Sequence, residues 1–378
     1  GGLGCGLNIK YNIALVDHRA ALGDAAAAGQ ARGGAGRPAC VPALPAFPCR
    51  PTSPSTDALS TFFLLESILI YPVVLCGGSG KRLWPISRKS LPKQFLDLSD
   101  SDSLLKQSLL RGQGPKYGPP VIVTSDSYRF LVAQHAKEIC KEKAHIILEP
   151  SPKNTAPSVL LACKFLQNLD PHAVVLVMPS DHYIPFNKSF YKTCTNIKNL
   201  FRKEALTLLG VLPDNPSTEY GYISIKPSNN ELKRVKSFIE KPELEKAKEL
   251  VKQPNTFWNA GIFCFEGKWL DESIKTYKPE MHSLLLDLLP ASEDDQIYFY
   301  PDKDKFSKLI DISFDKAIVE SNAHNYLVSL DAGWTDLGSW HSLSNLKKQP
   351  EHGLTLYTLS LIHISEPTRP ERIAYAGV

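Results

Sequence analysis

Short apolar runs alternate with longer amphipathic segments between about residues 69 and 350 of the 378-residue chain. Several runs are nearly all apolar and rich in Val, Ile and Leu, which is typical of strands buried on both faces of a sheet. They lie at 70–75, 121–124, 145–148, 173–178 and 206–211, and helical spacing appears between them at 127–143, 155–169 and 189–203. Strands that alternate with helices predict a Rossmann-like, doubly wound α/β sheet covered on both faces.

The rhythm changes after residue 212. Segments 222–226 and 232–240 flank a Pro-Ser-Asn-Asn turn and predict a β-hairpin, so the sheet is expected to be mixed. Further strands are expected at 261–265 and 326–330, and helices near 269–277 and 314–321. Since no long linker interrupts this region, we expect one α/β domain whose second half inserts substrate-binding structure.

The composition, 43% hydrophobic and 22% charged, is that of an ordinary globular protein. With 43 basic against 39 acidic residues, the net charge of +4 is too balanced to favour nucleic acid as a partner. Eight Cys in so long a chain favour a reducing compartment over a disulfide framework, so we expect a cytoplasmic protein. The apolar run at 61–76 contains Glu66 and Pro72 and is shorter than the ~20 residues that a bilayer requires, so no membrane association is expected.

The two ends differ from the middle. Residues 1–60 contain one Lys, Lys10, and no Glu, and Ala, Gly and Pro dominate much of this stretch. No secretory signal is recognisable, whereas a transit peptide stays open as an alternative. We expect residues 1–68 to be a non-native or disordered leader. Residues 359–369 resemble a sequencing adapter read through as protein, so we expect 354–378 to be an artefactual tail.

A glycine-rich loop follows the first expected strand. Glycines let backbone N–H groups approach phosphate oxygens, and an adjoining basic pair neutralises charge. The Walker A spacing fails because Leu75 stands where that motif has Gly, and the dinucleotide fingerprint fails at Leu83, so a P-loop kinase is excluded. A mere tight turn is the plain alternative. The candidate nucleotide-binding residues are Gly77, Gly78, Ser79, Gly80 and Lys81.

The loop sequence GGSGKRLWPISR at 77–88, followed by LPKQF at 91–95, resembles the signature of the sugar-1-phosphate nucleotidyltransferases. Trp84 and the pair Ser87-Arg88 point to the mannose-1-phosphate guanylyltransferase branch. The resemblance covers roughly 69–345 and implies the nucleotide-diphospho-sugar transferase fold, with a catalytic domain at 69–353. It also implies that GTP and mannose 1-phosphate are converted to GDP-mannose and pyrophosphate.

Such a reaction brings two polyanions together, so it requires charge neutralisation, in-line positioning and a metal bridge rather than a covalent nucleophile. By resemblance, Arg82 holds the triphosphate and Lys93 the α-phosphate in the transition state. We therefore expect Arg82 and Lys93 to be catalytic. The alternative for both is a surface cation on a solvated helix.

Two aspartates follow apolar strands. Asp181 stands at the carboxyl end of the strand at 173–178, the edge where doubly wound sheets place ligands. Asp336 lies in GWTDLGSW, after the strand at 326–330. Two carboxylates with phosphate oxygens and waters suit Mg²⁺, and by resemblance these two bind it. Each alone could be a cap or turn residue. We interpret the neighbouring His182 as structural, because an ionised phosphate nucleophile needs no base.

The segment EPSPKNTAP at 149–157 resembles the family's E-P-x-x-R-N-T-A-P segment near the nucleotide. The resemblance implies that Glu149, Lys153 and Asn154 bind nucleotide, although Lys153 lacks the planar fork of the usual Arg. A plain helix start is the alternative, with Asn154 or Thr155 as its cap. The preceding expected helix, at 127–143, has Ser127 or Ser125 available as a cap.

The resemblance also implies a sugar-phosphate site in the second half. Gly221 would allow close backbone approach to the hexose, Glu240 and Asn259 would hydrogen-bond to its hydroxyls, and Lys241 would hold its phosphate. Taken singly each signal is weak, because Lys-Pro is common at the start of a helix and Asn-Ala-Gly is a plausible turn.

Other functions stay open. The same fold could act on another sugar or base, and a non-catalytic regulatory homologue could keep the fold and bind a nucleotide sugar. The second alternative is less favoured because the expected catalytic and metal-binding residues are all present. A homo-oligomer is also left open.

Overall fold

The computed structural model describes residues 69–78, 81–97, 102–140, 143–200, 204–286, 288 and 297–346. The leader expected at 1–68 and the tail expected at 354–378 lie outside the described residues. The strands are β1 (Ile70–Cys76), β2 (Val121–Ser125), β3 (His145–Glu149), β4 (Val174–Pro179), β5 (Leu206–Val211), β6 (Tyr222–Ile225), β7 (Lys233–Ile239), β8 (Thr256–Glu266), β9 (Tyr298–Phe299) and β10 (Asn325–Ser329).

Helices occupy most of the connections between the strands. The α-helices are α2 (Leu104–Arg111), α3 (Arg129–Ile139), α4 (Thr155–Leu169), α5 (Asn187–Leu200), α6 (Leu244–Val251), α7 (Gly267–Tyr277), α8 (Pro279–Leu285), α9 (Lys303–Lys308) and α10 (Trp340–Leu346). The short 3-10 helices are η1 (Lys81–Leu83), η2 (Lys93–Phe95) and η3 (Asp126–Tyr128), and η4 (Asp315–Val319) is a π-helix.

In the described part of the chain the strands form one sheet in the order β5-β10-β7-β6-β8-β4-β1-β2-β3-β9. Strands β4, β1, β2, β3 and β9 pair in parallel, as the alternation of strands and helices predicts. Strand β8 pairs antiparallel with β4, β5 and β6, and β6 pairs antiparallel with β7. The expected mixed, doubly wound α/β sheet is therefore confirmed.

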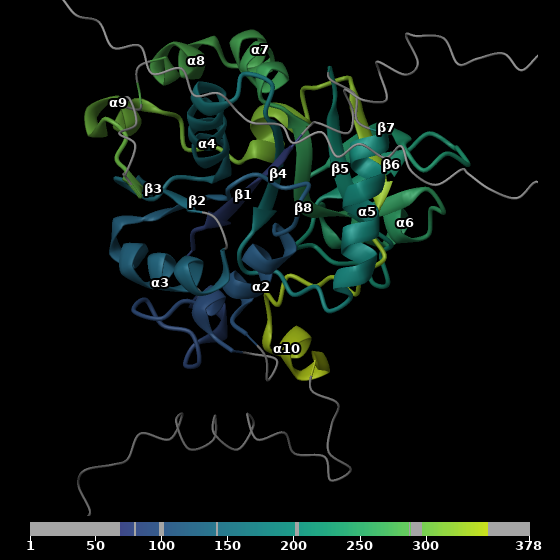
Figure 1. The fold of residues 1–378 in the computed structure, drawn as a ribbon. Coiled ribbons are helices and arrows are strands. Elements are labelled where there is room, and N and C mark those ends of the chain that lie inside the picture. Colours follow the sequence, from purple (N-terminus) through teal and green to yellow (C-terminus); the bar gives the residue numbers. More distant parts are fainter. Residues whose placement is uncertain are drawn as a thin grey trace, which may run out of the picture. The chain divides into compact units, whose positions relative to one another are not determined.

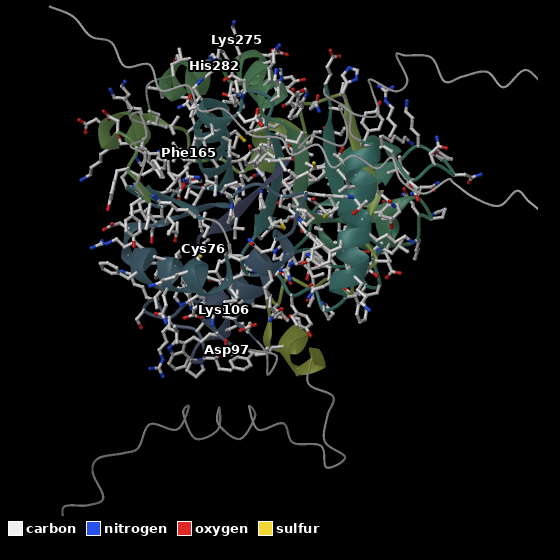
Figure 2. The ribbon with its side chains drawn as sticks, in the orientation of Figure 1. Cys76, Asp97, Lys106, Phe165, Lys275 and His282 are labelled. Atoms are coloured by element: carbon white, nitrogen blue, oxygen red, sulfur yellow. The ribbon has the colours of Figure 1, made fainter. Side chains whose placement is uncertain are left out.

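Successive side chains of the central strands enter two apolar layers, one on each face of the sheet. On β1, Val73 belongs to the layer beneath α4, α7 and α8, whereas Val74 belongs to the layer that packs on α2, α3 and α5. Figure 1 shows α4, α7 and α8 above the sheet and α2 and α3 below it. Figure 2 labels one side chain of each layer, Phe165 and Cys76. Both faces of the sheet are thus covered.

Several elements differ from the sequence expectation. Strand β8 starts at Thr256, five residues before the expected 261, because its first residues pair with β6. The strand then continues past Gly261, which has φ 65°, where its pairing with β5 shifts register. The helix expected at 127–143 is α3, which is shorter and has Tyr128 as an N-cap residue without a side-chain cap bond. Neither serine caps α3. Ser125 is the N-cap residue of η3 but makes no side-chain cap bond, and its hydroxyl bonds to that of Ser127 at 2.7 Å.

None of the helices that the structure describes is long and apolar enough to cross a membrane.

Candidate active site

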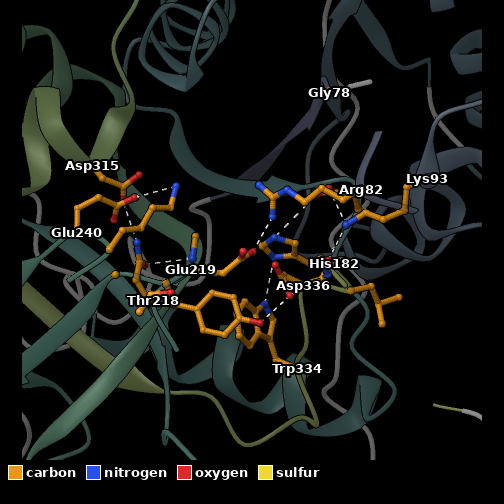
Figure 3. Close-up of a pocket in the computed structure, with 18 of the residues that line it drawn as sticks. Gly78, Arg82, Lys93, His182, Thr218, Glu219, Glu240, Asp315, Trp334 and Asp336 are labelled. Atoms are coloured by element: carbon orange, nitrogen blue, oxygen red, sulfur yellow. Dashed lines mark hydrogen bonds and ion pairs between the residues drawn. The ribbon is translucent and has the colours of Figure 1, made fainter. Parts of the chain in front are cut away.

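A pocket of about 650 Å³ opens at the carboxyl ends of β1 and β4 and continues toward β6, β7 and β8 (Figure 3). It is therefore at the sheet edge where doubly wound folds bind ligands. Residues predicted from the sequence make up much of its lining: Gly78, Arg82, Lys93, Asp181, Gly221, Glu240, Lys241, Asn259 and Asp336.

The glycine loop borders one end of the pocket. Gly78 has φ 89°, a conformation that favours glycine, and it lines the pocket. Gln94, which was not predicted as a site residue, donates from Nε2 to the carbonyls of Gly77 and Gly78 at 3.1 and 3.4 Å. Helix η2 is thus hydrogen-bonded to the glycine loop through Gln94. Ser79, Gly80 and the side chain of Lys81 lie outside the described residues.

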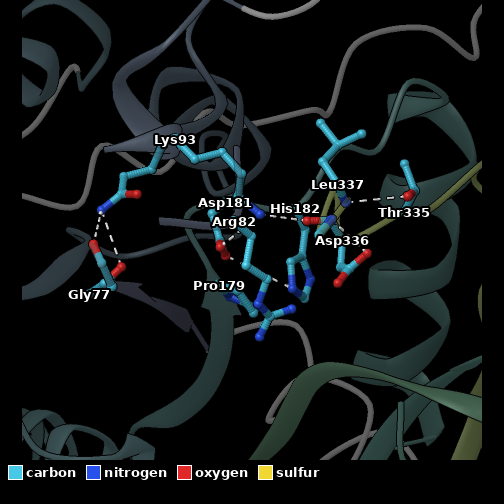
Figure 4. A network of polar contacts seen from close by, with 12 residues as sticks. Gly77, Arg82, Lys93, Pro179, Asp181, His182, Thr335, Asp336 and Leu337 are labelled. Carbon is cyan, nitrogen blue, oxygen red and sulfur yellow. Dashed lines mark hydrogen bonds and ion pairs between the residues drawn. The ribbon is translucent and has the colours of Figure 1, made fainter. Parts of the chain in front are cut away.

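Lys93 joins the two aspartates expected to bind metal (Figure 4). Its Nζ lies 3.0 Å from Oδ2 of Asp181 and donates to the backbone carbonyl of Asp336 at 2.6 Å. Burial disfavours the charge on Asp181, but the ammonium of Lys93, followed by His182, outweighs it and lowers the pKa of Asp181. The structure thus places a buried cation and an ionised carboxylate side by side in the pocket.

Asp336 is oriented by neighbours on both sides. Its Oδ1 accepts hydrogen bonds from the Tyr220 hydroxyl at 2.6 Å and from the Gly338 N–H at 3.1 Å. Burial, followed by the hydrogen bond to Asp336, raises the pKa of Tyr220, which therefore stays a donor. Tyr220 was missed as a functional residue, and its place beside Gly221 was the available signal.

His182 is held in one orientation by a tryptophan. Trp334 donates from Nε1 to His182 Nδ1 at 3.1 Å, so in the neutral ring Nε2 carries the proton and lies 3.9 Å from Oδ1 of Asp181. Burial lowers the pKa of His182, which keeps the ring neutral. This arrangement suits the structural role expected for His182.

The oxygen donors of the pocket fit Mg²⁺. Among the described residues no cluster of three or more His, Cys, Asp or Glu side chains surrounds a common point. Mg²⁺ is commonly held by one or two carboxylates together with substrate phosphates and waters, so it needs no such cluster. Asp181 and Asp336 line the same pocket and can supply those carboxylates.

Arg82 reaches across the pocket mouth to the loop before β6. Its guanidinium NH1 lies 2.8 Å from Oε2 of Glu219, and the two side chains are 66% and 56% exposed. The predicted phosphate-binding arginine is thus paired with a carboxylate in this structure. Glu219 was not predicted as a site residue, although it begins the segment 219–223 that contains the predicted Gly221.

The sugar-side residues gather at the other end of the pocket. A Cβ on Gly221 would lie 2.7 Å from Oε2 of Glu240, so a larger residue there would press on this carboxylate. The Lys241 ammonium lies 3.4 Å from Oε1 of Glu240. Asn259 donates from Nδ2 to Oδ1 of Asp315 at 2.7 Å. Asp315, at the start of η4, lines the pocket and was not predicted from the sequence.

Three of the predicted nucleotide-binding residues, Glu149, Lys153 and Asn154, lie at the β3–α4 junction and not in the lining of this pocket. Glu149 accepts a hydrogen bond from the Ser158 hydroxyl at 2.6 Å, and burial raises its pKa to about 7. Lys153 donates to the carbonyls of Ser307 and Leu309. The expected cap is confirmed, because the Asn154 side chain accepts from the N–H of Thr155.

Several known proteins are similar to this chain in sequence or in fold. The model of the nucleotidyl transferase family matches residues 71–352. A mannose-1-phosphate guanylyltransferase of Salmonella montevideo is 34% identical over 292 residues, which cover 75% of this chain and 61% of that protein. The chain spans about three fifths of the length of the curated relatives that it matches.

Solved structures of two proteins with related names are similar to this chain in fold. A mannose-1-phosphate geranyltransferase from Thermus thermophilus superposes with a TM-score of 0.65 and 28% identity, over 75% of this chain and 81% of that one. A mannose-6-phosphate isomerase from Helicobacter pylori gives 0.61 and 29%, over 71% and 100%. The nucleotide-diphospho-sugar transferase fold implied by the glycine-loop signature is thereby confirmed. The chain belongs to the nucleotidyl transferase family.

Proposed function

We propose that this protein transfers a guanylyl group from GTP to α-D-mannose 1-phosphate, which gives GDP-mannose and pyrophosphate. The observation that carries this proposal is the position of Lys93. Its ammonium contacts Asp181 and the backbone of Asp336 in a pocket that both the glycine loop and the sugar-side residues line. A phosphate placed there would meet a fixed cation and a pair of carboxylates suited to Mg²⁺.

One group of residues would bind GTP, and a second group would bind mannose 1-phosphate. The glycine loop and Arg82 would hold the triphosphate, with Glu149, Lys153 and Asn154 near the rest of the nucleotide. These segments follow β1 and β3, parallel strands that end at the same edge of the sheet. Gly221, Glu240, Lys241 and Asn259 would hold mannose 1-phosphate.

The chemistry then requires only alignment and charge neutralisation. The sugar phosphate oxygen attacks the α-phosphorus of GTP in line with the leaving pyrophosphate, and Lys93 stabilises the charge that accumulates on the α-phosphate. Asp181 and Asp336 would hold Mg²⁺, which when bound neutralises phosphate charge and helps to align the two phosphates. Tyr220 keeps the Asp336 carboxylate oriented toward the pocket. No general base is needed.

The location and assembly belong to the same proposal. The described cysteines Cys76, Cys140, Cys163, Cys194 and Cys264 are free thiols, which supports a reducing, cytoplasmic setting. A homo-oligomer is compatible with the proposal and is not required by it, because one chain supplies every residue named above.

Product analysis tests the proposal. The full chain is incubated with Mg²⁺, mannose 1-phosphate and one of GTP, UTP, dTTP or ATP, and nucleotide sugars are separated and identified. We expect GDP-mannose as the main product, and none with an Asp336→Asn variant. A different main product would favour a relative with another base. Binding of GDP-mannose without any product from any pair would favour a regulatory homologue.

A further inference from the structure

The first turn of α4 contacts the chain just before η4. These contacts are hydrogen bonds from the backbone or side chains of one segment to the other. They run from Lys153 Nζ to the Ser307 carbonyl at 3.0 Å, from Asn154 N–H to Asp311 Oδ1 at 2.9 Å, from Ala156 N–H to the Ile312 carbonyl at 3.1 Å, and from Phe314 N–H to Thr155 Oγ1 at 2.9 Å. Residues 307–314 are therefore fixed to the start of α4.

This fixed segment leads into the π-helix η4, a form that is rare and often found at functional sites. Ala317, Ile318 and Val319 are fully buried, so the short helix has little freedom to move. Asp315, its first residue, lines the pocket instead. The hydrogen bonds from the start of α4 to residues 307–314 and the buried turn of η4 together determine where the Asp315 carboxylate lies.

Asp315 and Glu240 lie next to each other at the sugar end of the pocket (Figure 3). Asn259 donates to Oδ1 of Asp315, and the Lys241 ammonium contacts Oε1 of Glu240. Burial, followed by the charge of Glu240, raises the pKa of Asp315 to about 7. Loss of water is thus only partly compensated at Asp315 by the hydrogen bonds from Asn259 and from its own backbone N–H.

Two adjacent carboxylates with an amide match neighbouring hydroxyl groups of a sugar. Each hydroxyl can donate to one of the carboxylate oxygens, and a carboxyl group keeps acceptor capacity even when it holds a proton. We infer that Asp315 is a further sugar-recognition residue, which accepts a hydrogen bond from a hexose hydroxyl adjacent to the one bound by Glu240. Thr155 is then a positioning residue, because it acts on the sugar only through the segment that carries Asp315. This inference rests on the proposed function.

Asp315→Asn in the full chain tests the contact. Asparagine keeps an oxygen that can accept from Asn259, but it places an NH2 group where the second carboxylate oxygen stands, so the acceptor for the sugar hydroxyl is lost. We expect KM for mannose 1-phosphate to rise about 10- to 100-fold, with KM for GTP unchanged. Deoxy analogues of mannose 1-phosphate, each lacking one hydroxyl, should include one for which the variant and the wild type have the same KM. If the effect of the variant is equal for every analogue, Asp315 makes no direct hydroxyl contact.

Three further variants separate recognition from folding. Thr155→Val removes the acceptor for Phe314 N–H and should raise the sugar KM, whereas Thr155→Ser keeps the acceptor and should restore it. Asp304→Asn removes an exposed carboxylate of α9 outside the pocket and should leave both KM values unchanged. A Thr155→Val variant that changes only thermal stability would overturn the positioning role.

Calorimetric titration with mannose 1-phosphate makes failure of the inference distinguishable from failure of the proposed function. If the wild type turns over and Asp315→Asn keeps its sugar KM, the inference fails and the proposed function stands. If the wild type does not turn over but binds mannose 1-phosphate, and Asp315→Asn weakens that binding, the inference stands alone. If the wild type neither turns over nor binds any hexose 1-phosphate, both fail.

Discussion

The ammonium of Lys93 lies 3.0 Å from the carboxylate of Asp181, and the Lys93 side chain is only 10% exposed. Because the same ammonium also bonds to the Asp336 carbonyl, one side chain connects the loop after β4 with the loop after β10. Lys93 therefore holds the site together before any substrate arrives. Because Lys93 is expected to act on the substrate and also connects two loops, its replacement should affect both turnover and stability.

Replacement of Lys93 by Met should lower kcat about 10²- to 10³-fold, because the α-phosphate loses a preorganised cation. Stability should fall as well, since Asp181 is left without its cation, although the 35% exposure of Asp181 limits the loss. Steady-state kinetics and thermal unfolding measure the two effects. Lys89→Met, which removes an exposed lysine on the same stretch, is the matched control. A kcat near that of the wild type would refute the catalytic assignment.

Replacement of Tyr220 by Phe removes the hydroxyl that orients Asp336 at 2.6 Å. We expect the Mg²⁺ concentration for half-maximal activity to rise roughly tenfold, the lower end of what loss of such a supporting hydrogen bond costs. Activity is measured against Mg²⁺ at saturating substrates. Tyr191→Phe serves as control, because its hydroxyl bonds to the Leu110 carbonyl outside the pocket. An unchanged Mg²⁺ requirement for Tyr220→Phe would speak against Asp336 as a ligand.

Replacement of Glu219 by Gln breaks its ion pair with Arg82. Since an exposed pair is weak, stability should stay the same, but Arg82 no longer has to leave a carboxylate in order to bind phosphate. KM for GTP should fall roughly two- to fivefold, and less at high salt. Glu204→Gln removes an equal charge at an exposed position that does not line the pocket. A higher KM in Glu219→Gln would mean that Glu219 itself assists nucleotide binding.

Replacement of Glu149 by Gln should change how stability depends on pH. Burial raises the pKa of Glu149 from 4.5 to about 7, so between these values the folded protein holds a proton that the unfolded chain has lost. Stability of the wild type therefore falls as pH rises through this window, by roughly 3 kcal/mol at most. Gln cannot ionise, so the variant should gain stability relative to wild type from pH 4.5 to 7 and keep the gain above pH 7.

Thermal unfolding midpoints of both proteins, measured at matched pH values, provide this comparison. Glu272→Gln, at an exposed position of α7, should show no such rise relative to the wild type. A constant difference between Glu149→Gln and the wild type across the pH range would show that the pKa of Glu149 is the same in the folded and the unfolded chain, which would contradict its raised value.

The strands and helices could be predicted from the sequence more fully than the contacts between the residues of the pocket. The apolar strand at 206–211 and the helix at 155–169 agree with β5 and α4 because local spacing determines them. Asp181 could be placed at a strand's carboxyl end for the same reason. Lys93, however, lies beside Asp181 because η2 is fixed to the loop after β1 through Gln94, a contact between separate segments that no local pattern encodes.

Asp315 is the clearest example of a pocket residue that the sequence alone could not identify. Its sequence surroundings read as an amphipathic helix at 314–321, in which one aspartate is an unremarkable surface residue. Its place in the pocket results from hydrogen bonds to the start of α4, about 160 residues earlier in the chain. The same contacts show that the segment at 149–157, which is expected to contact the nucleotide, also fixes the segment that leads to Asp315.

The most direct test of the proposed function is release of pyrophosphate by the full chain with GTP, mannose 1-phosphate and Mg²⁺, compared between wild type and Lys93→Met. We predict steady release by the wild type that requires both substrates, and release lower by about two orders of magnitude or more in the variant. Absence of release by the folded wild type, or equal release by the two proteins, would contradict the account.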